Sequence, residues 1–408
     1  MLFVTREFQM IFCVFLVVSM YYLNSYFVFR APAIFSFDGL KCPFCFGDTF
    51  CSRVDRVDVR LTLIDYILDK LDRKTVFYGK FKDHPIVIKK LATTEERFHL
   101  EDKISYLFDH QFNYYDYKFE EEARRFYYES LLLLNSSFHD PSYKLKWCPT
   151  LTGVTQFFDP IIQENFYDTI ALNIWTSLVL NPEPLMLQVF KAEDGWPVPK
   201  YFGSCGQAAF VAYCGESLNN YFHHSWLLRV HIAEELLQIA QTFTFKNPKI
   251  GVYLRDLSYD NVVMDPHLKV RVVDLEHVIL VDKNEAPGMP STWYSIHRSE
   301  HFECQNCITY SPIIICSHHL SDHNFYAVCK EFFHSESPND YGLLHSLPNN
   351  TLYDDKIQLI KHYAELCVQP TNNESRFEIA GKLKKLLSEV KNEENFDKKR
   401  PTLLYEYD

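Results

Sequence analysis

One run of residues between short apolar stretches constrains the fold of this chain more than any other feature. The run LRDLSYDN occupies residues 254–261, and two short apolar stretches within 262–273 follow it. Such a pair of stretches predicts a β-hairpin, which would bring Asp274 back to the end of the run. We therefore expect three oxygen-bearing side chains, Asp256, Asn261 and Asp274, to lie together.

The same run fits the catalytic-loop pattern of protein kinases, H-R-D-L-x-x-x-N, with Leu254 in place of the histidine. In phosphoryl transfer one carboxylate accepts the proton of the substrate hydroxyl group, which suits Asp256. Magnesium or manganese bound with ATP needs hard oxygen ligands, which suits Asn261 and Asp274. The alternative is that Asp256 and Asn261 only cap a turn, but the spacing to Asp274 favours the kinase-like site. The tripeptide ending at Glu276 is Asp-Leu-Glu where kinases usually have Asp-Phe-Gly.

A lysine for the nucleotide is expected on the apolar strand 85–91. The residues up to Lys89 match the kinase pattern V-A-I-K except for the missing alanine, so Lys89 would contact the α- and β-phosphates of ATP. Lys90 is an alternative, and a lysine that ends an edge strand is often simply solvated.

The loop over the phosphates and the acid that pairs with the lysine leave weaker signals. No G-x-G-x-x-G motif precedes the lysine, and only Gly79, in an expected turn with Lys80, offers a loop glycine. The acid is expected on the helix 161–180, where Glu164 and Asp168 share a face without matching a motif. The sequence therefore does not select the acid.

The N-terminal part of the chain predicts entry into the secretory pathway. Residues 8–29 are almost entirely apolar between Arg6 and Arg30, and the stretch is long enough to cross a bilayer. The motif Ala-Pro-Ala at 31–33 has the form of a cleavage site, but its proline and the preceding arginine disfavour cleavage. We expect an uncleaved signal anchor, and hence a type II membrane protein of the Golgi or ER; a cleaved signal peptide and secretion are the alternative.

Cysteines and glycosylation sequons support that compartment, because disulfides persist in the secretory pathway. The chain has 12 cysteines, and sequons lie at Asn135, Asn349 and Asn373. Cys214 lies in an apolar run and is expected to be free and buried. Zinc is the alternative to disulfides at two CxxC pairs, which are too far apart for a zinc ribbon: Cys42 with Cys45, and Cys304 with Cys307.

Composition excludes one class of partner. The net charge is −12 and no basic stripe is visible, which argues against binding of nucleic acid. Aromatic residues make up 16% of the chain, and a large aromatic core explains them without a base-stacking surface.

The order of expected elements predicts an α+β, two-lobed, protein-kinase-like fold with disulfide staples. A small sheet-rich N-lobe should span 75–215, with a strand at 185–190 and a helical insertion near 95–150. A helical C-lobe should follow, with a helix over 225–243 behind the catalytic loop and a final helix opened by a capping box at 375–378. The expected segments are 1–33 for the anchor or signal peptide, 34–74 for a cysteine-bearing segment, 75–215 and 216–391 for the lobes, and 392–408 for a tail.

Several longer motifs lie at residues 42–47 with Cys51, 181–184, 195–197, 201–206, 254–261, 273–274 with Glu276, 322–329 and 342–345. Together they resemble the divergent protein kinase domain family, specifically its "deleted in autism" branch. The similarity covers the chain from about Lys41 to Leu387. It implies a cysteine-rich kinase-like fold in the Golgi or secreted, with a disulfide-laden activation segment and with Glu276 at the position of the kinase glycine.

Two functions remain open. The chain is either a lumenal kinase that transfers the γ-phosphoryl group of ATP to hydroxyl groups of secretory proteins, or a pseudokinase that acts as a secreted signalling or trafficking factor. The retained Asp256, Asn261 and Asp274 favour the first function. The missing glycine loop and the unassigned acid favour the second.

Overall fold

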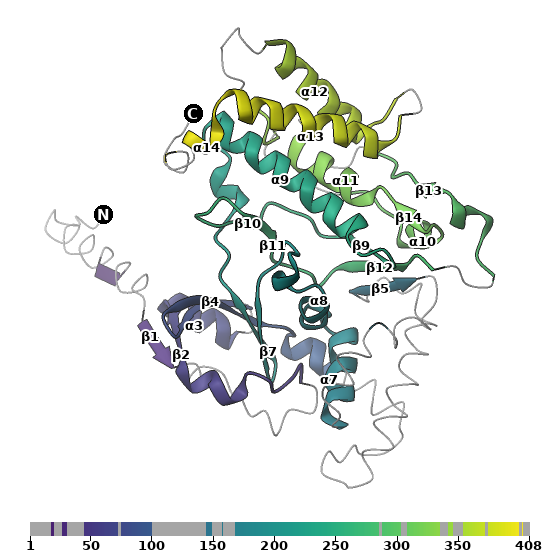
Figure 1. Ribbon diagram of the computed structural model, residues 1–408. Coiled ribbons are helices and arrows are strands. Elements are labelled where there is room, and N and C mark those ends of the chain that lie inside the picture. Colours follow the sequence, from purple (N-terminus) through teal and green to yellow (C-terminus); the bar gives the residue numbers. More distant parts are fainter. Residues whose placement is uncertain are drawn as a thin grey trace, which may run out of the picture. The chain divides into compact units, whose positions relative to one another are not determined.

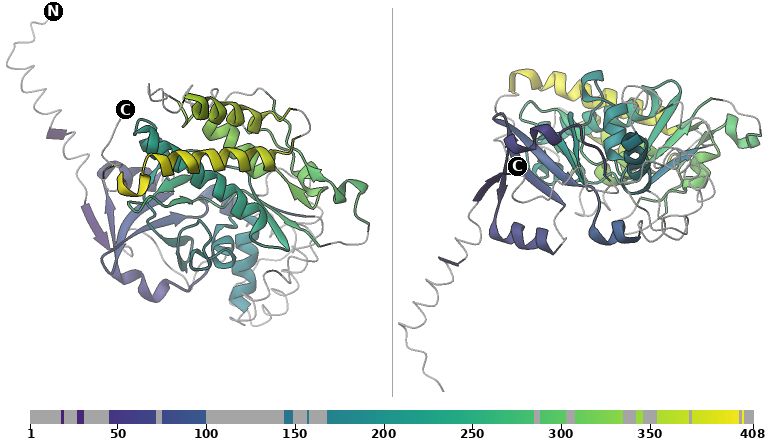
Figure 2. Two further views of the ribbon diagram at one scale, coloured as in Figure 1. Left: turned by 45° about the horizontal axis from the view of Figure 1, so that its top comes forward. Right: turned by 90° about the horizontal axis from the view of Figure 1, so that it is seen from below.

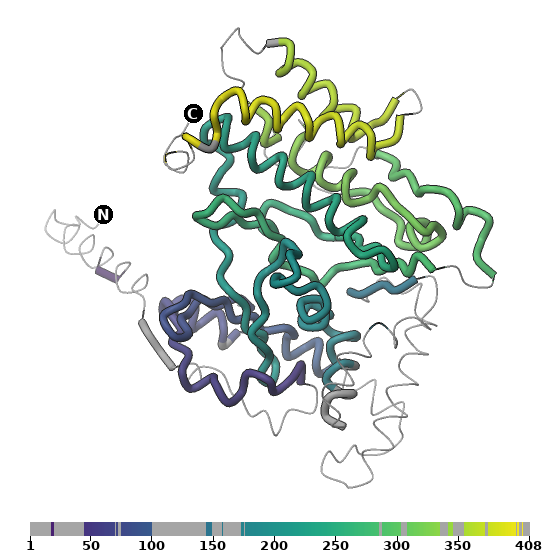
Figure 3. Tube along the Cα trace, in the orientation of Figure 1, coloured from purple at the N-terminus to yellow at the C-terminus, as the bar shows by residue number. Residues whose placement is uncertain are grey.

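The fold is described from a computed structural model of the chain. The course of the chain can be followed in Figure 3. Described residues are 18–19, 27–30, 45–71, 75–99, 144–148, 157, 168–284, 288–302, 308–334, 342–345, 354–371, 374–399 and 402. Several predictions lie outside these residues: most of the apolar segment, the cleavage-like motif, the sequons at Asn135, Asn349 and Asn373, most of the 95–150 insertion, and Cys42, Cys304, Cys307 and Glu164.

The chain divides into two compact units, and both contain segments that are distant in sequence. One unit comprises Met1–Arg125, Tyr167–Pro184 and Lys200–Tyr213, and the other Phe126–Phe166, Leu185–Pro199 and Cys214–Asp408. The first unit is rich in sheet and the second contains the long helices, as the kinase-like fold class predicted (Figure 1).

A six-stranded sheet of order β1-β2-β3-β4-β7-β6 builds the first unit. All neighbouring strands in it are antiparallel. Its strands are β1 (Phe27–Arg30), β2 (Val57–Leu61), β3 (Val76–Phe81), β4 (His84–Lys90), β6 (Tyr201–Cys205) and β7 (Ala208–Ala212).

One face of this sheet is covered by an aromatic cluster around Phe50. The Phe50 ring stacks on Phe210 at a centroid distance of 4.3 Å and meets the edge of Phe81 at 5.1 Å. The adjacent disulfide Cys51–Cys205 joins the short helix η1 (Cys51–Arg56) to β6. Aromatic residues are thus used as core, as composition suggested.

The hairpin between β3 and β4 corrects one expected turn. The turn lies at Lys82 and Asp83, whose φ angles of 49° and 65° suit a tight hairpin connection. The expected turn residue Gly79 is instead inside β3, where a Cβ atom would lie 2.4 Å from the Asp58 carbonyl oxygen. Gly79 therefore allows β2 and β3 to approach each other and contributes no loop.

The strand expected at 185–190, after the predicted helix at 161–180, is a second prediction that was wrong. Helix α7 (Asp168–Val179) is followed by α8 (Glu183–Val189), in the place of the strand expected at 185–190. A short apolar run does not distinguish a strand from a buried helix. The Asn181 side chain accepts a hydrogen bond from the Glu183 amide at 3.0 Å, as an N-cap does, and thereby favours the helix.

The second unit is organised around helix α9 (Trp226–Phe245), which matches the expected helix at 225–243. Helix α13 (Arg376–Glu393) packs along α9, and α12 (Asp354–Val368) packs on α13 (Figure 2). The predicted capping box at Ser375 and Glu378 is present at the start of α13. The buried face of α13 contains Leu387, whereas Leu386 is only half-buried. Further helices are α10 (Pro312–Cys316), α11 (His323–Val328), the π-helix η5 (Cys329–Phe333) and α14 (Phe396–Lys399).

Short sheets complete the second unit. One has the order β5-β12-β9, another β11-β10-β8, and β13 pairs with β14. Strand β5, which falls within the residues expected to form the first lobe, pairs with β12 of the second unit. The strands are β5 (Leu145–Cys148), β8 (Glu216–Ser217), β9 (Ile250–Leu254), β10 (Val262–Met264), β11 (Val270–Val272), β12 (Val278–Asp282), β13 (Ile296–His297) and β14 (Leu320–Ser321).

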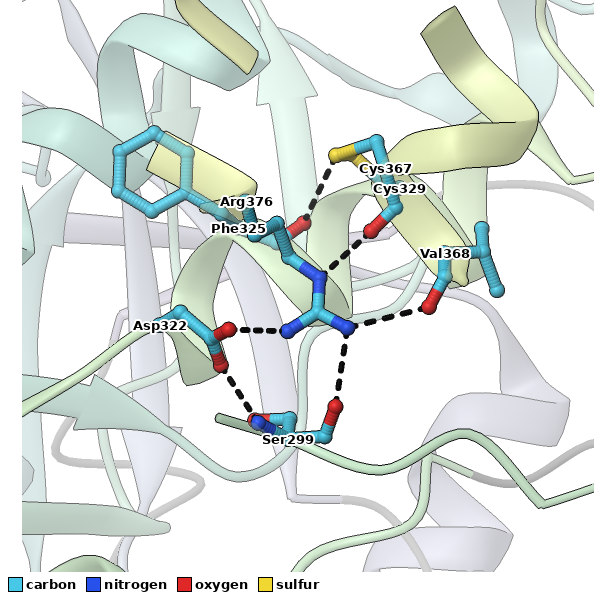
Figure 4. Close-up of a disulfide and its surroundings, with 7 residues drawn as sticks. All are labelled: Ser299, Asp322, Phe325, Cys329, Cys367, Val368 and Arg376. Carbon is cyan, nitrogen blue, oxygen red and sulfur yellow. Dashed lines mark hydrogen bonds and ion pairs between the residues drawn. A yellow bond between two sulfur atoms is a disulfide. The ribbon is translucent and has the colours of Figure 1, made fainter. Parts of the chain in front are cut away.

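Disulfides staple the second unit, as expected. Cys148–Cys316 joins β5 to α10, and Cys329–Cys367 joins η5 to α12. Beside the latter, the buried Arg376 guanidinium pairs with Asp322 and donates to the carbonyl oxygens of Ser299, Cys367 and Val368 (Figure 4). Cys45 is also disulfide-bonded, and Cys214 carries a buried thiol, as predicted.

Within the residues that the structure describes, no helix combines the length and hydropathy needed to cross a membrane. Most of the apolar segment 8–29 lies outside these residues, although Val18 and Ser19 are helical. The end of the segment, Phe27–Arg30, forms strand β1 of the first unit.

Candidate active site

The hairpin β10–β11 brings together the candidate site residues of the second unit. Val262 pairs with Val272 across the hairpin, and the Val273 amide donates to the Asn261 carbonyl oxygen at 2.9 Å. Asn261 therefore precedes one strand of the hairpin and Asp274 follows the other at the same end. This is the arrangement that the spacing in the sequence predicted.

A second strand pair places Asp256. Strand β9 ends at Leu254 and pairs with Val278 at the start of β12, and the Arg255 amide donates to the His277 carbonyl oxygen at 3.0 Å. The Asn261 side-chain amide group in turn donates to the Asp256 carbonyl oxygen at 3.1 Å. Asp256 is thus held next to the segment that carries Asp274.

Helix α11 holds the backbone at Leu254, where protein kinases have a histidine. The Asn324 Oδ1 atom accepts from the Leu254 amide at 2.9 Å, and the His323 Nε2 atom lies 2.9 Å from the Leu254 carbonyl oxygen. Both side chains are buried, and burial lowers the pKa of His323 to about 4, so it is neutral at physiological pH. The neutral ring can donate from Nε2 to the carbonyl group and fix the loop without a charge.

The electrostatics around Asp256 suit an acid–base residue. Asp256 is an exposed residue, but partial burial of its carboxyl group and the nearby Asp274 carboxylate raise its pKa. His277 and the hydrogen bond with the Asn261 side chain oppose that rise. A cation bound at Asp274 would relieve the repulsion between the two carboxylates.

Glu276 is held by Lys144 and His277. Lys144 lies 3.2 Å from its Oε2 atom, and His277 lies 3.2 Å from its Oε1 atom. Burial opposes ionisation of Glu276, but the His277 hydrogen bond and the Lys144 charge outweigh it and lower the pKa to about 2. Glu276 is therefore ionised, and its charge is partly compensated by Lys144.

The metal-ligand positions offer oxygen atoms of the right kind. The Asp274 Oδ1 atom accepts from the Glu276 amide at 3.0 Å, which orients the carboxylate. Asn261 uses its amide nitrogen for the loop, so its Oδ1 atom suits a cation. In the part of the chain described, no cluster of three or more His, Cys, Asp or Glu side chains forms a metal site. A divalent ion at Asp274 and Asn261 would need phosphate oxygens or water to complete its shell, as Mg²⁺ usually does.

The first unit contains an ion pair of which the sequence predicted the lysine but did not select the acid. Lys89 on β4 lies 2.7 Å and 2.9 Å from the two carboxylate oxygens of Glu183 at the start of α8. The partner acid is therefore on the helix after Asn181 and not on the helix that contains Asp168. The asparagine cap before Glu183 was the available signal, but the strand expected at 185–190 concealed it.

Lys90 has a different partner. Its Nζ atom lies 2.5 Å from Asp69 of helix α3 (Leu63–Lys70), which connects β2 to β3. In protein kinases a glycine-rich loop covers the phosphates. Here β2 and β3 are the two strands that precede the lysine strand β4 along the chain. The connection between β2 and β3 contains an eight-residue helix.

Comparisons with known proteins agree with this geometry. The family model described as the protein-kinase domain of FAM69 matches residues 174–370. Divergent protein kinase domain 2A of Homo sapiens is 28% identical over 381 residues, which cover 86% of this chain and 87% of that protein. The Xenopus tropicalis protein of the same name is 28% identical over 380 residues, covering 86% and 87%. Divergent protein kinase domain 2B of Homo sapiens is 28% identical over 127 residues, covering 31% and 29%.

Proposed function

This chain belongs to the divergent protein kinase domain family, and from that premise we propose that it is a phosphotransferase of the secretory pathway. It would bind ATP with Mg²⁺ or Mn²⁺ and transfer the γ-phosphoryl group to hydroxyl groups of lumenal or secreted proteins. The observation that carries the proposal is the ion pair between Lys89 and Glu183. In active protein kinases such a pair holds the strand lysine on the nucleotide phosphates.

Each site residue has a role in this reaction. Lys89, oriented by Glu183, contacts the α- and β-phosphates. Asp256 accepts the proton of the acceptor hydroxyl group, and its raised pKa improves it as a base near neutral pH. Asp274 and Asn261 would hold the divalent ion, which would neutralise charge on the phosphates when bound.

A pseudokinase is the second candidate function, and helix α3 favours it. The helix occupies the connection from β2 to β3, and the chain has no G-x-G-x-x-G motif to cover the phosphates. A chain that binds nucleotide weakly, or not at all, would act through its surface as a secreted signalling or trafficking factor. The N-terminal apolar segment supports a lumenal location for either function.

Thermal unfolding of the purified chain tests the proposal. A nucleotide at about 100 times its dissociation constant stabilises a protein by about 2.7 kcal/mol. We expect Mg-ATP or Mn-ATP to raise the melting temperature of the wild-type chain. The shift should be lost in Asp274→Ala and retained in a control variant, Asp194→Ala, which removes an exposed carboxylate from the same unit.

Transfer is tested separately from binding. Phosphosites on co-expressed secretory proteins, counted by mass spectrometry, should appear with the wild-type chain and disappear with Asp256→Asn. A nucleotide-dependent shift without phosphosites would establish the pseudokinase. No shift with either metal would refute nucleotide binding altogether.

A further inference from the structure

Helix α3 exposes apolar residues to solvent and turns an acid inward. Surface helices normally direct their apolar face to the core. In α3 and the residue that follows, five large apolar side chains are between 40% and 61% exposed, whereas Asp69 is only 6% exposed. We call these five residues the α3 patch: Leu63, Ile64, Tyr66, Ile67 and Leu71.

Two interactions fix this orientation of the helix. At its start, the Thr62 side chain accepts from the Asp65 amide and the Asp65 side chain accepts from the Thr62 amide, which forms a capping box. Near its end, Asp69 forms the ion pair with Lys90 of β4. Rolling the helix to bury its apolar face would expose Asp69 and leave Lys90 without this partner, so the α3 patch stays outward.

The strand register places this patch next to the apolar N-terminal segment. Strands β1 and β2 are antiparallel, and Phe27 is paired with Leu61. The chain thus enters β1 from the apolar segment at the end of β2 from which Thr62 and α3 depart. With 27–30 in a strand, residues 8–26 remain for a membrane span, close to the about 20 residues that a helical span requires.

We propose that the α3 patch lies in the headgroup region of the bilayer that residues 8–26 cross. A span that ends at the start of β1 brings the membrane surface to that end of the sheet. An amphipathic helix at such a place is stabilised when its apolar face enters the boundary between headgroups and acyl chains. The patch then gives the first unit a second contact with the membrane in addition to the span.

A second copy of the chain fits the patch less well. Stable protein interfaces use about 20–30 residues from each partner, with shape complementarity. The patch offers five side chains on two helical turns, which is too few for such an interface. Lipid imposes no requirement for complementary shape.

Photolabelling of the full chain in vesicles tests the proposal. The chain is reconstituted in phosphatidylcholine vesicles that contain a small fraction of phosphatidylcholine with a diazirine on its acyl chain. Labelled peptides are then identified by mass spectrometry. We expect label in residues 63–71 as well as in the apolar segment, and none in α10, whose Ile313 and Ile314 are 52% and 50% exposed.

Matched variants separate the patch from general hydrophobicity. The double substitution Ile64→Ser with Ile67→Ser should remove the label from 63–71 and leave the melting temperature unchanged, because both side chains are exposed. The control, Ile313→Ser with Ile314→Ser, should leave the label in place. Label in the apolar segment but none in α3 would refute the contact while the span stands. Label in neither segment, or cross-linking of α3 to a second copy, would also overturn the proposal.

Discussion

The ion pair of Lys89 and Glu183 gives the sharpest test of the first unit. The Lys89 side chain is 13% exposed and the Glu183 side chain 2%, with Nζ–O distances of 2.7 Å and 2.9 Å. At an effective dielectric constant of about 20, two unit charges about 2.8 Å apart attract by about 6 kcal/mol. Desolvation of Glu183 opposes much of this gain, so the net contribution of the pair is small.

Breaking the pair from one side should nevertheless be costly, because it removes the opposite charge from beside a buried one. We expect Lys89→Met, or Glu183→Leu, to lower the free energy of unfolding by about 3–5 kcal/mol. The double variant should cost less than the sum of the two single variants, with a coupling energy of about 2 kcal/mol. Urea unfolding followed by circular dichroism measures all three variants.

An exposed ion pair serves as the control for the buried pair of Lys89 and Glu183. Lys382→Met removes an exposed ion pair with Glu374 and should leave the free energy of unfolding nearly unchanged. If the costs of the two single variants, at Lys89 and at Glu183, sum to the cost of the double variant within about 0.5 kcal/mol, the pairing is refuted. Loss of the Mg-ATP shift in Glu183→Gln, at unchanged fold, would connect the pair to the nucleotide.

Three further predictions concern the second unit. Burial and the nearby Asp256 raise the pKa of Glu331 from 4.5 to about 7. The folded state therefore binds the proton of Glu331 more tightly than the unfolded state does. The chain loses this stability as the pH rises from about 4.5 through 7. Glu331→Gln should therefore stabilise the chain at pH 8 by at most about 3 kcal/mol and change little at pH 4, as pH-dependent melting would show. The disulfide Cys329–Cys367 closes a loop with a sequence separation of 38. Replacing both cysteines with serine should therefore lower the free energy of unfolding by about 4 kcal/mol. An unchanged urea midpoint would contradict this. Burial raises the pKa of the Cys214 thiol to about 11, so iodoacetamide should modify it only after unfolding, and rapid labelling of the native chain would show that the site is open.

The arrangement of the loop at 254–261 and Asp274 was predictable from the sequence because its parts are local. The spacing of 254–261, the following apolar stretches and Asp274 required only that a hairpin form, and β10 pairs with β11 as expected. The capping box at Ser375 and the buried thiol of Cys214 were also predictable, because each depends on a few neighbouring residues.

The glutamate of the first unit was not predictable in the same way. Lys89 and Glu183 are 94 residues apart in sequence, and an apolar run after Glu183 suits a strand as well as a helix. Gly79 illustrates the same problem in reverse. A glycine in a short segment indicates a turn, but here it permits the close approach of β2 and β3.

By itself, the sequence determined the kinase-like order of elements, the local loop of Asp256 and Asn261, and the hairpin that returns Asp274 to it. Only the tertiary structure decided which acid Lys89 binds, which partner Lys90 takes and which face of α3 points outward. The physical reason is that hairpins and caps depend on neighbouring residues. Ion pairs and helix orientation depend instead on the packing of segments whose separation in sequence carries no information about their distance in space.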